Sequence, residues 1–150
     1  MIKQRILFID DEPDFLRGLE GYFSVEYEVQ TAASAEKGLA LINQAQFDAV
    51  ITDMSMPGGM TGVDLVKEVR RFDPVLPIIV MTGVGTIESA VEAIQQGAFH
   101  YITKPFEIKD LEITLQRAVE NGRLHRQLAR KQGNELQEDY ILGSSRGIQE

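Results

Sequence analysis

The sequence predicts an α/β domain built on a five-stranded, doubly wound parallel sheet, and three observations lead to this fold class. Short apolar runs and segments with helical spacing alternate five times along the chain. Such alternation implies right-handed crossovers, with helices on both faces of a parallel sheet. A stretch of about 120 residues with five strands suits the small doubly wound fold of strand order 2-1-3-4-5.

The apolar runs are the expected strands. Four of them contain β-branched residues in or beside a continuous apolar stretch, which is typical of strands buried on both faces of a parallel sheet. The second run alternates apolar and polar residues and is expected at an edge of the sheet. In chain order, the runs cover residues 6–9, 27–31, 49–52, 78–81 and 99–102.

Amphipathic segments between these runs are the expected helices. Pro13 fits the first turn of the first helix, while Ser34 and Thr86 fit the N-caps of the second and fourth. Gly97 is expected to end the fourth helix in a left-handed conformation. The expected apolar faces are Phe15, Leu16, Leu19 and Phe23; Ala35, Leu39 and Ile42; Val63, Leu65, Val66 and Val69; Ile87, Ala90, Val91 and Ile94; and Ile108, Leu111, Leu115 and Ala118.

The last helical pattern is longer than the sheet requires. About 13 residues would cover five strands, yet the pattern can run over residues 107–131, with Gly133 as its end. Gly122 is expected to weaken its middle by about 1 kcal/mol relative to Ala. Toward its end the only regularly spaced apolar residues are Leu124 and Leu128. Two interpretations of this part therefore remain: a short parallel coiled coil with a second copy of the chain, or a solvated linker.

Composition and charge exclude several functional classes. No apolar run reaches the roughly 18 residues that span a membrane. The absence of Cys excludes disulfides, thiolate metal sites and thiol catalysis, and it fits the cytoplasm. With 15 basic and 23 acidic residues and a net charge of −8, direct binding of nucleic acid by this chain is not expected. The turn DDEPD and the lack of GxxxxGK[ST] disfavour dinucleotide and P-loop nucleotide binding.

Polar residues follow four of the expected strands at the same edge of the sheet: Asp10 and Asp11, then Asp53, Thr82 and Lys104. Sites in open α/β sheets lie beyond the carboxyl ends of strands where the strand order switches, here between the first and third strands. Three carboxylates there repel one another unless a cation or proton intervenes, and oxygen-only ligands suit Mg²⁺. A nearby ammonium and hydroxyl would hold a phosphoryl group against a carboxylate that can accept it covalently.

These residues lie in stretches that resemble the receiver domain of two-component response regulators over about residues 3–120. The matching stretches read ILFIDDEPD, DAVITDMSMPG, PIIVMTG and GAFHYITKPF. The resemblance implies a flavodoxin-like fold, with Asp53 as the acceptor of a phosphoryl group from a sensor histidine kinase. It also implies a Mg²⁺ ion held by Asp53, by Asp11 directly, by Asp10 mainly through water, and by the backbone carbonyl of Ser55.

The same resemblance assigns Thr82 and Tyr101 as a switch pair and Lys104 as the phosphate-binding lysine. In this family the peptide bond between Lys104 and Pro105 is often cis. One feature departs from the family pattern, which has a glycine eight residues after the acceptor within MPxMxG. Here MPGGMTG places that glycine at Gly62, so the loop is expected to carry one extra residue.

The end of the chain leads to an expectation about domain organisation. Residues 1–120 are expected to form the receiver domain, and residues 121–140 a helical linker. Residues 141–150 resemble the opening of the AAA+ ATPase domain of σ54-dependent transcription activators of the NtrC and DctD type. The chain is therefore expected to be the regulatory part of a longer activator that dimerises through its last helix and linker. ATP hydrolysis would then belong to the output domain, and this chain would be no enzyme beyond its own phosphorylation and dephosphorylation.

Two alternative functions remain open. A phosphatase of the haloacid dehalogenase type also uses an Asp after a strand, but usually has a second Asp two residues later, where this chain has Ser55. A pseudo-receiver would be an interaction module that is never phosphorylated, and the complete set of site residues argues against it.

Overall fold

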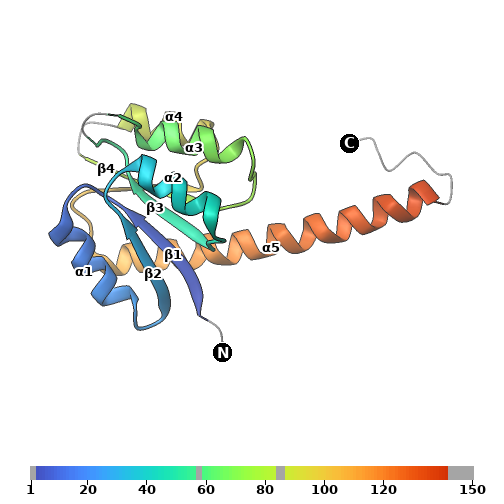
Figure 1. The fold of residues 1–150 in the computed structure, drawn as a ribbon, viewed down its shortest axis with the longest axis horizontal. Coiled ribbons are helices and arrows are strands. Elements are labelled where there is room, and N and C mark those ends of the chain that lie inside the picture. The colour runs from blue at the N-terminus through green and yellow to red at the C-terminus, as the bar shows by residue number, and fades with distance from the viewer. Residues whose placement is uncertain (1–2, 57–58, 84–86, 142–150) are drawn as a thin grey trace.

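The computed structural model describes residues 3–56, 59–83 and 87–141, which form the predicted α/β fold (Figure 1). Its five strands form one sheet of order β2-β1-β3-β4-β5, with every neighbouring pair parallel, as predicted. Strands and helices alternate in chain order: β1 (Gln4–Ile9), α1 (Pro13–Phe23), β2 (Tyr27–Ala32), α2 (Ala35–Gln44), β3 (Ala49–Asp53), α3 (Gly62–Arg70), β4 (Ile78–Thr82), α4 (Ile87–Gln95), β5 (His100–Thr103) and α5 (Ile108–Ile141).

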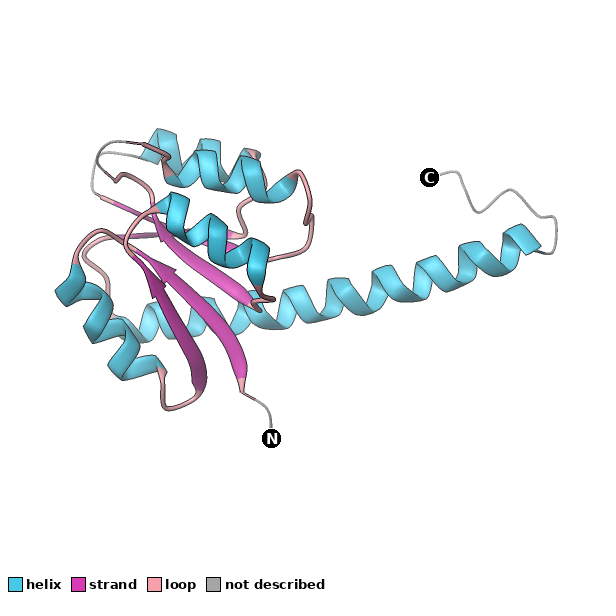
Figure 2. Cartoon of the chain, viewed as in Figure 1, coloured by secondary structure: helices cyan, strands magenta, loops and turns pink. Residues whose placement is uncertain are grey.

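Two apolar clusters cover the two faces of the sheet. Successive side chains of β1 alternate between them: Ile6 and Phe8 pack with α1 and α5, whereas Leu7 and Ile9 pack with α2, α3 and α4. Figure 2 shows these two helical layers on opposite sides of the strands. Because β1, β3 and β4 are buried on both faces, their continuous apolar runs follow directly from their central position.

The two edge strands differ in how well the sequence predicted them. β2 lies at one edge, as its alternating pattern indicated. The run over residues 99–102 was expected to be buried on both faces, and this was wrong. It forms β5, which starts one residue later at His100, lies at the other edge and is only partly buried.

Most of the predicted helix ends are confirmed. Pro13 is the first residue of α1, and the Ser34 side chain accepts a hydrogen bond of 3.1 Å from the backbone N–H of Lys37. Gly97 follows α4 with φ of +119°, a left-handed conformation that a side chain would strain. Thr86, the expected cap of α4, lies outside the described residues.

The buried face of α4 is only partly the predicted one. Ala90 is buried as expected, whereas Val91 and Ile94 were expected in the core and are exposed. Ala93, which was not part of the predicted face, is fully buried. The predicted faces of the other helices are buried or partly buried.

α5 extends far beyond the sheet, as Figures 1 and 2 show. It has 34 residues and continues through Gly133 to Ile141, so the expected end at Gly133 was wrong. A single interior glycine costs only about 1 kcal/mol, which the helix-forming residues around it offset. Leu124 and Leu128 are 48% and 53% exposed on the projecting part. Despite its length α5 is too polar to cross a bilayer, and no other helix in the described ranges qualifies.

Gly122 has a packing role that its helix propensity did not suggest. A Cβ atom at this position would lie 2.8 Å from Cγ of Pro77, so α5 can approach the start of β4 only because the side chain is absent. Four residues later, Arg126 donates a hydrogen bond of 3.3 Å to the carbonyl of Phe47 and lies 3.7 Å from Asp48. These contacts fix α5 where it leaves the domain.

Replacing Gly122 by Ala is therefore expected to lower the free energy of unfolding by about 1–2 kcal/mol through overpacking against Pro77. The matched control is Gly18→Ala in α1, where a new Cβ would meet nothing within 4 Å. This control should gain up to about 1 kcal/mol from better helix propensity. Urea unfolding of both variants measures the difference, and equal stabilisation of the two would contradict the packing role.

Candidate functional site

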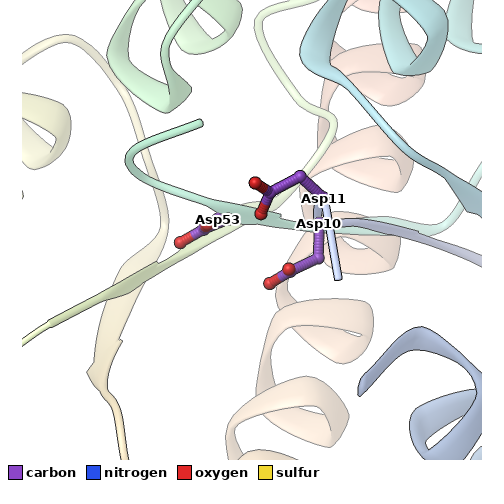
Figure 3. A group of neighbouring side chains, drawn as sticks. All are labelled: Asp10, Asp11 and Asp53. Carbon is purple, nitrogen blue, oxygen red and sulfur yellow. The ribbon is translucent and has the colours of Figure 1, made fainter. Parts of the chain in front are cut away.

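Three carboxylates meet at the carboxyl ends of β1 and β3, where the strand order of the sheet switches. Asp10 and Asp11 follow β1 directly, and Asp53 is the last residue of β3. The register pairs Ile9 with Thr52, so the two strands end side by side. One oxygen from each acid lies within 4.8 Å of the other two, and Figure 3 shows the carboxyl groups directed to the same side. The sheet thus brings together acids that lie more than 40 residues apart in sequence.

Lys104 reaches the same place from the end of β5. Its Nζ atom donates a hydrogen bond of 2.8 Å to Asp10 and lies 3.6 Å from Asp53. Its backbone N–H donates to the carbonyl of Thr82 at 2.7 Å, which holds the residue beside β4. The peptide bond to Pro105 is cis, as the family resemblance indicated. The ammonium group therefore lies between two of the three acids.

The two neighbouring acids have different environments. The Asp10 side chain is 0% exposed, and both of its oxygens have partners. One accepts the Lys104 ammonium, and the other accepts the backbone N–H of Glu12 at 2.9 Å. Asp11 is exposed. Asp10 is therefore a buried anchor for the lysine, and Asp11 is the acid that faces solvent.

The electrostatics of the site favour a cation. Burial raises the pKa of Asp53; the charge of Lys104 and a hydrogen bond from the Ser55 backbone oppose this rise, whereas Asp10 and Asp11 add to it. Burial alone would lower the pKa of Lys104, but its hydrogen bond to Asp10 and the charges of Asp53 and Asp10 raise it overall. Lys104 therefore stays charged at neutral pH and offsets only part of the negative charge.

Thr82 and Tyr101, the expected switch pair, lie on the two strands beyond β3. Thr82 is buried at the end of β4, one residue past Met81, which pairs with Asp53. Tyr101, in β5, pairs with Val80 of β4. It is partly buried against the apolar cluster that α2, α3 and α4 cover.

Gly62, the glycine that follows the loop after Asp53, lies against the end of β3. Gly62 is the first residue of α3, and its N–H donates to the carbonyl of Met54 at 2.9 Å. A Cβ at Gly62 would lie 2.9 Å from the carbonyl oxygen of Asp53, so this close approach requires glycine. Gly59 has a φ of +128°, a backbone conformation that glycine adopts without strain.

Sequence reasoning missed two residues that support the site. Glu36, at the start of α2, accepts the backbone N–H of Met60 at 2.8 Å and so ties the loop after Asp53 to a second helix. Phe15 was expected only as part of a buried helix face, yet its ring centroid is 4.6 Å from Nζ of Lys104. Neither contact joins residues close in sequence, and no spacing pattern predicts either one.

The sheet order and the acidic cluster at its switch point define the flavodoxin-like class of doubly wound α/β domains. Within that class the chain belongs to the response regulator receiver domain family, whose profile matches residues 6–116.

Several regulatory proteins and solved structures resemble the chain. The C4-dicarboxylate transport transcriptional regulatory protein DctD of Rhizobium meliloti is 38% identical over 120 residues, which are 79% of this chain and 26% of DctD. The nitrogen assimilation regulatory protein NtrX of Azorhizobium caulinodans is 34% identical over 147 residues, which are 97% of this chain and 32% of NtrX. The crystal structure of the receiver domain of NtrX from Brucella abortus superposes with a TM-score of 0.72 at 38% identity, covering 77% of this chain and 98% of that domain.

The chain spans about a third or less of the length of these curated regulators. The family match over residues 6–116 includes Asp10, Asp11, Asp53 and Lys104, so the whole acidic site lies within it.

Proposed function

We propose that the chain accepts a phosphoryl group on Asp53 from the phosphohistidine of a sensor histidine kinase. The observation that carries this proposal is the Lys104 ammonium, which lies 2.8 Å from Asp10 and 3.6 Å from Asp53 at the rim of a three-carboxylate cluster. An ammonium group beside an acceptor carboxylate can neutralise the negative charge on the oxygens of an incoming phosphoryl group.

The donor set of this cluster fits Mg²⁺. Asp11 and Asp53 would bind the ion directly, Asp10 would act through water, and the backbone carbonyl of Ser55 would complete the protein ligands. All of these donors are oxygens, which Mg²⁺ prefers, and one or two carboxylates with several waters are its usual protein environment. When bound, the ion would neutralise phosphoryl oxygens and offset the repulsion among the acids.

The chemical step transfers the phosphoryl group from a donor histidine to an acceptor aspartate. A carboxylate oxygen of Asp53 forms a bond to phosphorus, while the bond from phosphorus to the donor imidazole nitrogen breaks and its electron pair stays on that nitrogen. No redox change is involved. Lys104 faces the transferred oxygens throughout, and Asp10, buried and hydrogen-bonded to it, holds the ammonium in place.

Phosphorylation would then change the surface formed by α4, β5 and α5. The new phosphoryl oxygens would accept a hydrogen bond from Thr82, and the space that Thr82 leaves would let Tyr101 turn inward from its partly buried position. A local charge-assisted contact would thus bias a two-state packing arrangement.

The reaction would take place in the cytoplasm, within a longer transcription activator of the σ54-dependent type. Residues 121–140 would form a helical linker, and residues 141–150 would begin an AAA+ output domain. Homodimerisation would use the linker and the projecting part of α5, where Leu124 and Leu128 are exposed.

A labelling experiment with acetyl phosphate tests the proposal without a kinase. We expect one phosphoryl group per chain in the presence of Mg²⁺, detected by intact mass, and its release by hydroxylamine. Chelation of Mg²⁺ should reduce labelling at least about tenfold. No labelling under any condition would indicate a pseudo-receiver, whereas steady turnover of a generic phosphate ester would indicate a phosphatase; either result overturns the proposal.

A further inference from the structure

We propose that Phe15 positions the ammonium group of Lys104 between Asp10 and Asp53 through the face of its aromatic ring. This inference rests on the proposed function, because the activity it affects is the phosphorylation of Asp53. Phe15 is a positioning residue, since its contact is with the lysine and its effect on the acceptor passes through that lysine.

The geometry is that of a cation–π contact. Nζ of Lys104 lies over the Phe15 ring, 4.6 Å from its centroid, inside the limit of about 6 Å for this attraction. Phe15 is the third residue of α1, only four positions after Asp11. The turn that carries the acidic pair therefore also brings the ring under the lysine.

The ring is itself held in place by a second aromatic contact. Phe15 and Phe106 pack edge to face, with centroids 6.2 Å apart and planes at 71°. Phe106 comes two residues after Lys104, and both aromatic residues pack against the apolar cluster beneath α1 and α5. The pair thus ties the start of α1 to the segment that carries Lys104.

This contact restricts a side chain that would otherwise be mobile. A lysine ammonium sits on a flexible four-carbon stem, and here it is 26% exposed. Asp10 and Asp53 attract it from the side of the site, while the ring covers it from the side of α1.

The inference explains why an aromatic residue stands at this position. A half-buried site on the apolar face of α1 requires only an apolar side chain, and Leu would meet that requirement, although it would lose the edge-to-face contact with Phe106. Only an aromatic ring attracts a cation through its face. Phe15 can therefore act on the Lys104 ammonium in a way that an aliphatic side chain of similar volume cannot.

Phe15→Leu and Phe15→Tyr separate the aromatic face from apolar volume. We expect Phe15→Leu to slow labelling by acetyl phosphate in saturating Mg²⁺ by roughly threefold, and Phe15→Tyr to recover most of that loss. In a Lys104→Ala background, Phe15→Leu should have no further effect, because the residue acts through the lysine. Phe23→Leu is the matched control: its ring lies on the same helix but packs on Phe8, 5.3 Å away, and its loss should leave the labelling rate unchanged.

A second readout does not depend on phosphorylation. The proton NMR signals of the Lys104 side chain, which the face of a nearby aromatic ring shifts upfield, should lose that shift in Phe15→Leu and keep it in Phe15→Tyr. Equal labelling rates and equal Lys104 side-chain shifts in the two variants would overturn the positioning role, as would an undiminished effect of Phe15→Leu in the Lys104→Ala background. If the unmodified chain is not labelled but the difference in shift is present, the proposed function fails while the contact between ring and lysine stands.

Discussion

Replacing Asp53 by Asn is expected to reduce labelling by acetyl phosphate at least about a hundredfold. The substitution keeps the size of the side chain but removes the carboxylate oxygen that would form the bond to phosphorus. Asp11 is the exposed acid of the cluster, but the ion pairs of Lys104 are with Asp10 and Asp53. Intact mass after incubation with the phosphodonor and Mg²⁺ measures the loss, and undiminished labelling of the variant would refute the assignment of Asp53.

The control for this variant is its free energy of unfolding, which should rise at pH 7. Burial and the neighbouring acids raise the pKa of Asp53 above 3.8 in the folded chain. Because the pKa of Asp53 is raised in the folded chain, this group stabilises the fold below pH 3.8, and that stabilisation is lost as the pH rises through the pKa of the folded state. At pH 7 without metal, ionised Asp53 therefore opposes folding, and Asp53→Asn should be more stable by on the order of 1 kcal/mol. Urea unfolding at pH 7 and at low pH should show this difference shrinking on acidification.

The central part of the fold and the convergence of the site residues were predictable from local patterns. Continuous apolar runs identified β1, β3 and β4, because central parallel strands are buried on both faces. Once the strand order was fixed, the rule that sites form at the switch in that order placed Asp10 and Asp53 together. Only the residue type at each strand end was needed for this step.

The features that sequence reasoning missed depend on contacts between distant segments. Val91 and Ile94 share a helical stripe with Ala90, and the spacing alone does not show that the core meets Ala90 and Ala93 while the two larger side chains stay exposed. Gly122 has a low helix propensity. The reason for a glycine here, the close approach of α5 to Pro77, can be recognised only from how α5 packs. Periodicity describes which residues share a face, but it does not describe what that face meets.

Lys104→Met is expected to lower the free energy of unfolding by about 2–3 kcal/mol in the absence of metal. The Asp10 carboxylate is 0% exposed and has the lysine as its charged partner at 2.8 Å. Removing one member of a buried ion pair leaves the other charge uncompensated, which is strongly destabilising. Met keeps the length of the apolar stem, so the loss reports mainly on charge. Urea unfolding at neutral pH measures this loss of stability. The pKa of Lys104 is raised above its ordinary value of 10.5 in the folded chain, so the stabilisation by its charge is fully present at any pH below 10.5.

The double variant Asp10→Asn/Lys104→Met separates pairing from packing. If the loss in Lys104→Met comes from an unpaired buried carboxylate, neutralising Asp10 as well should recover most of it, because no buried charge then remains. Mg²⁺ should also stabilise Lys104→Met more than the unmodified chain, since the ion replaces the missing positive charge among the acids. A double variant as unstable as Lys104→Met would mean that the loss does not come from an unpaired Asp10 carboxylate. The same measurement therefore decides whether the 2.8 Å contact between Asp10 and Lys104 contributes to stability through its charges.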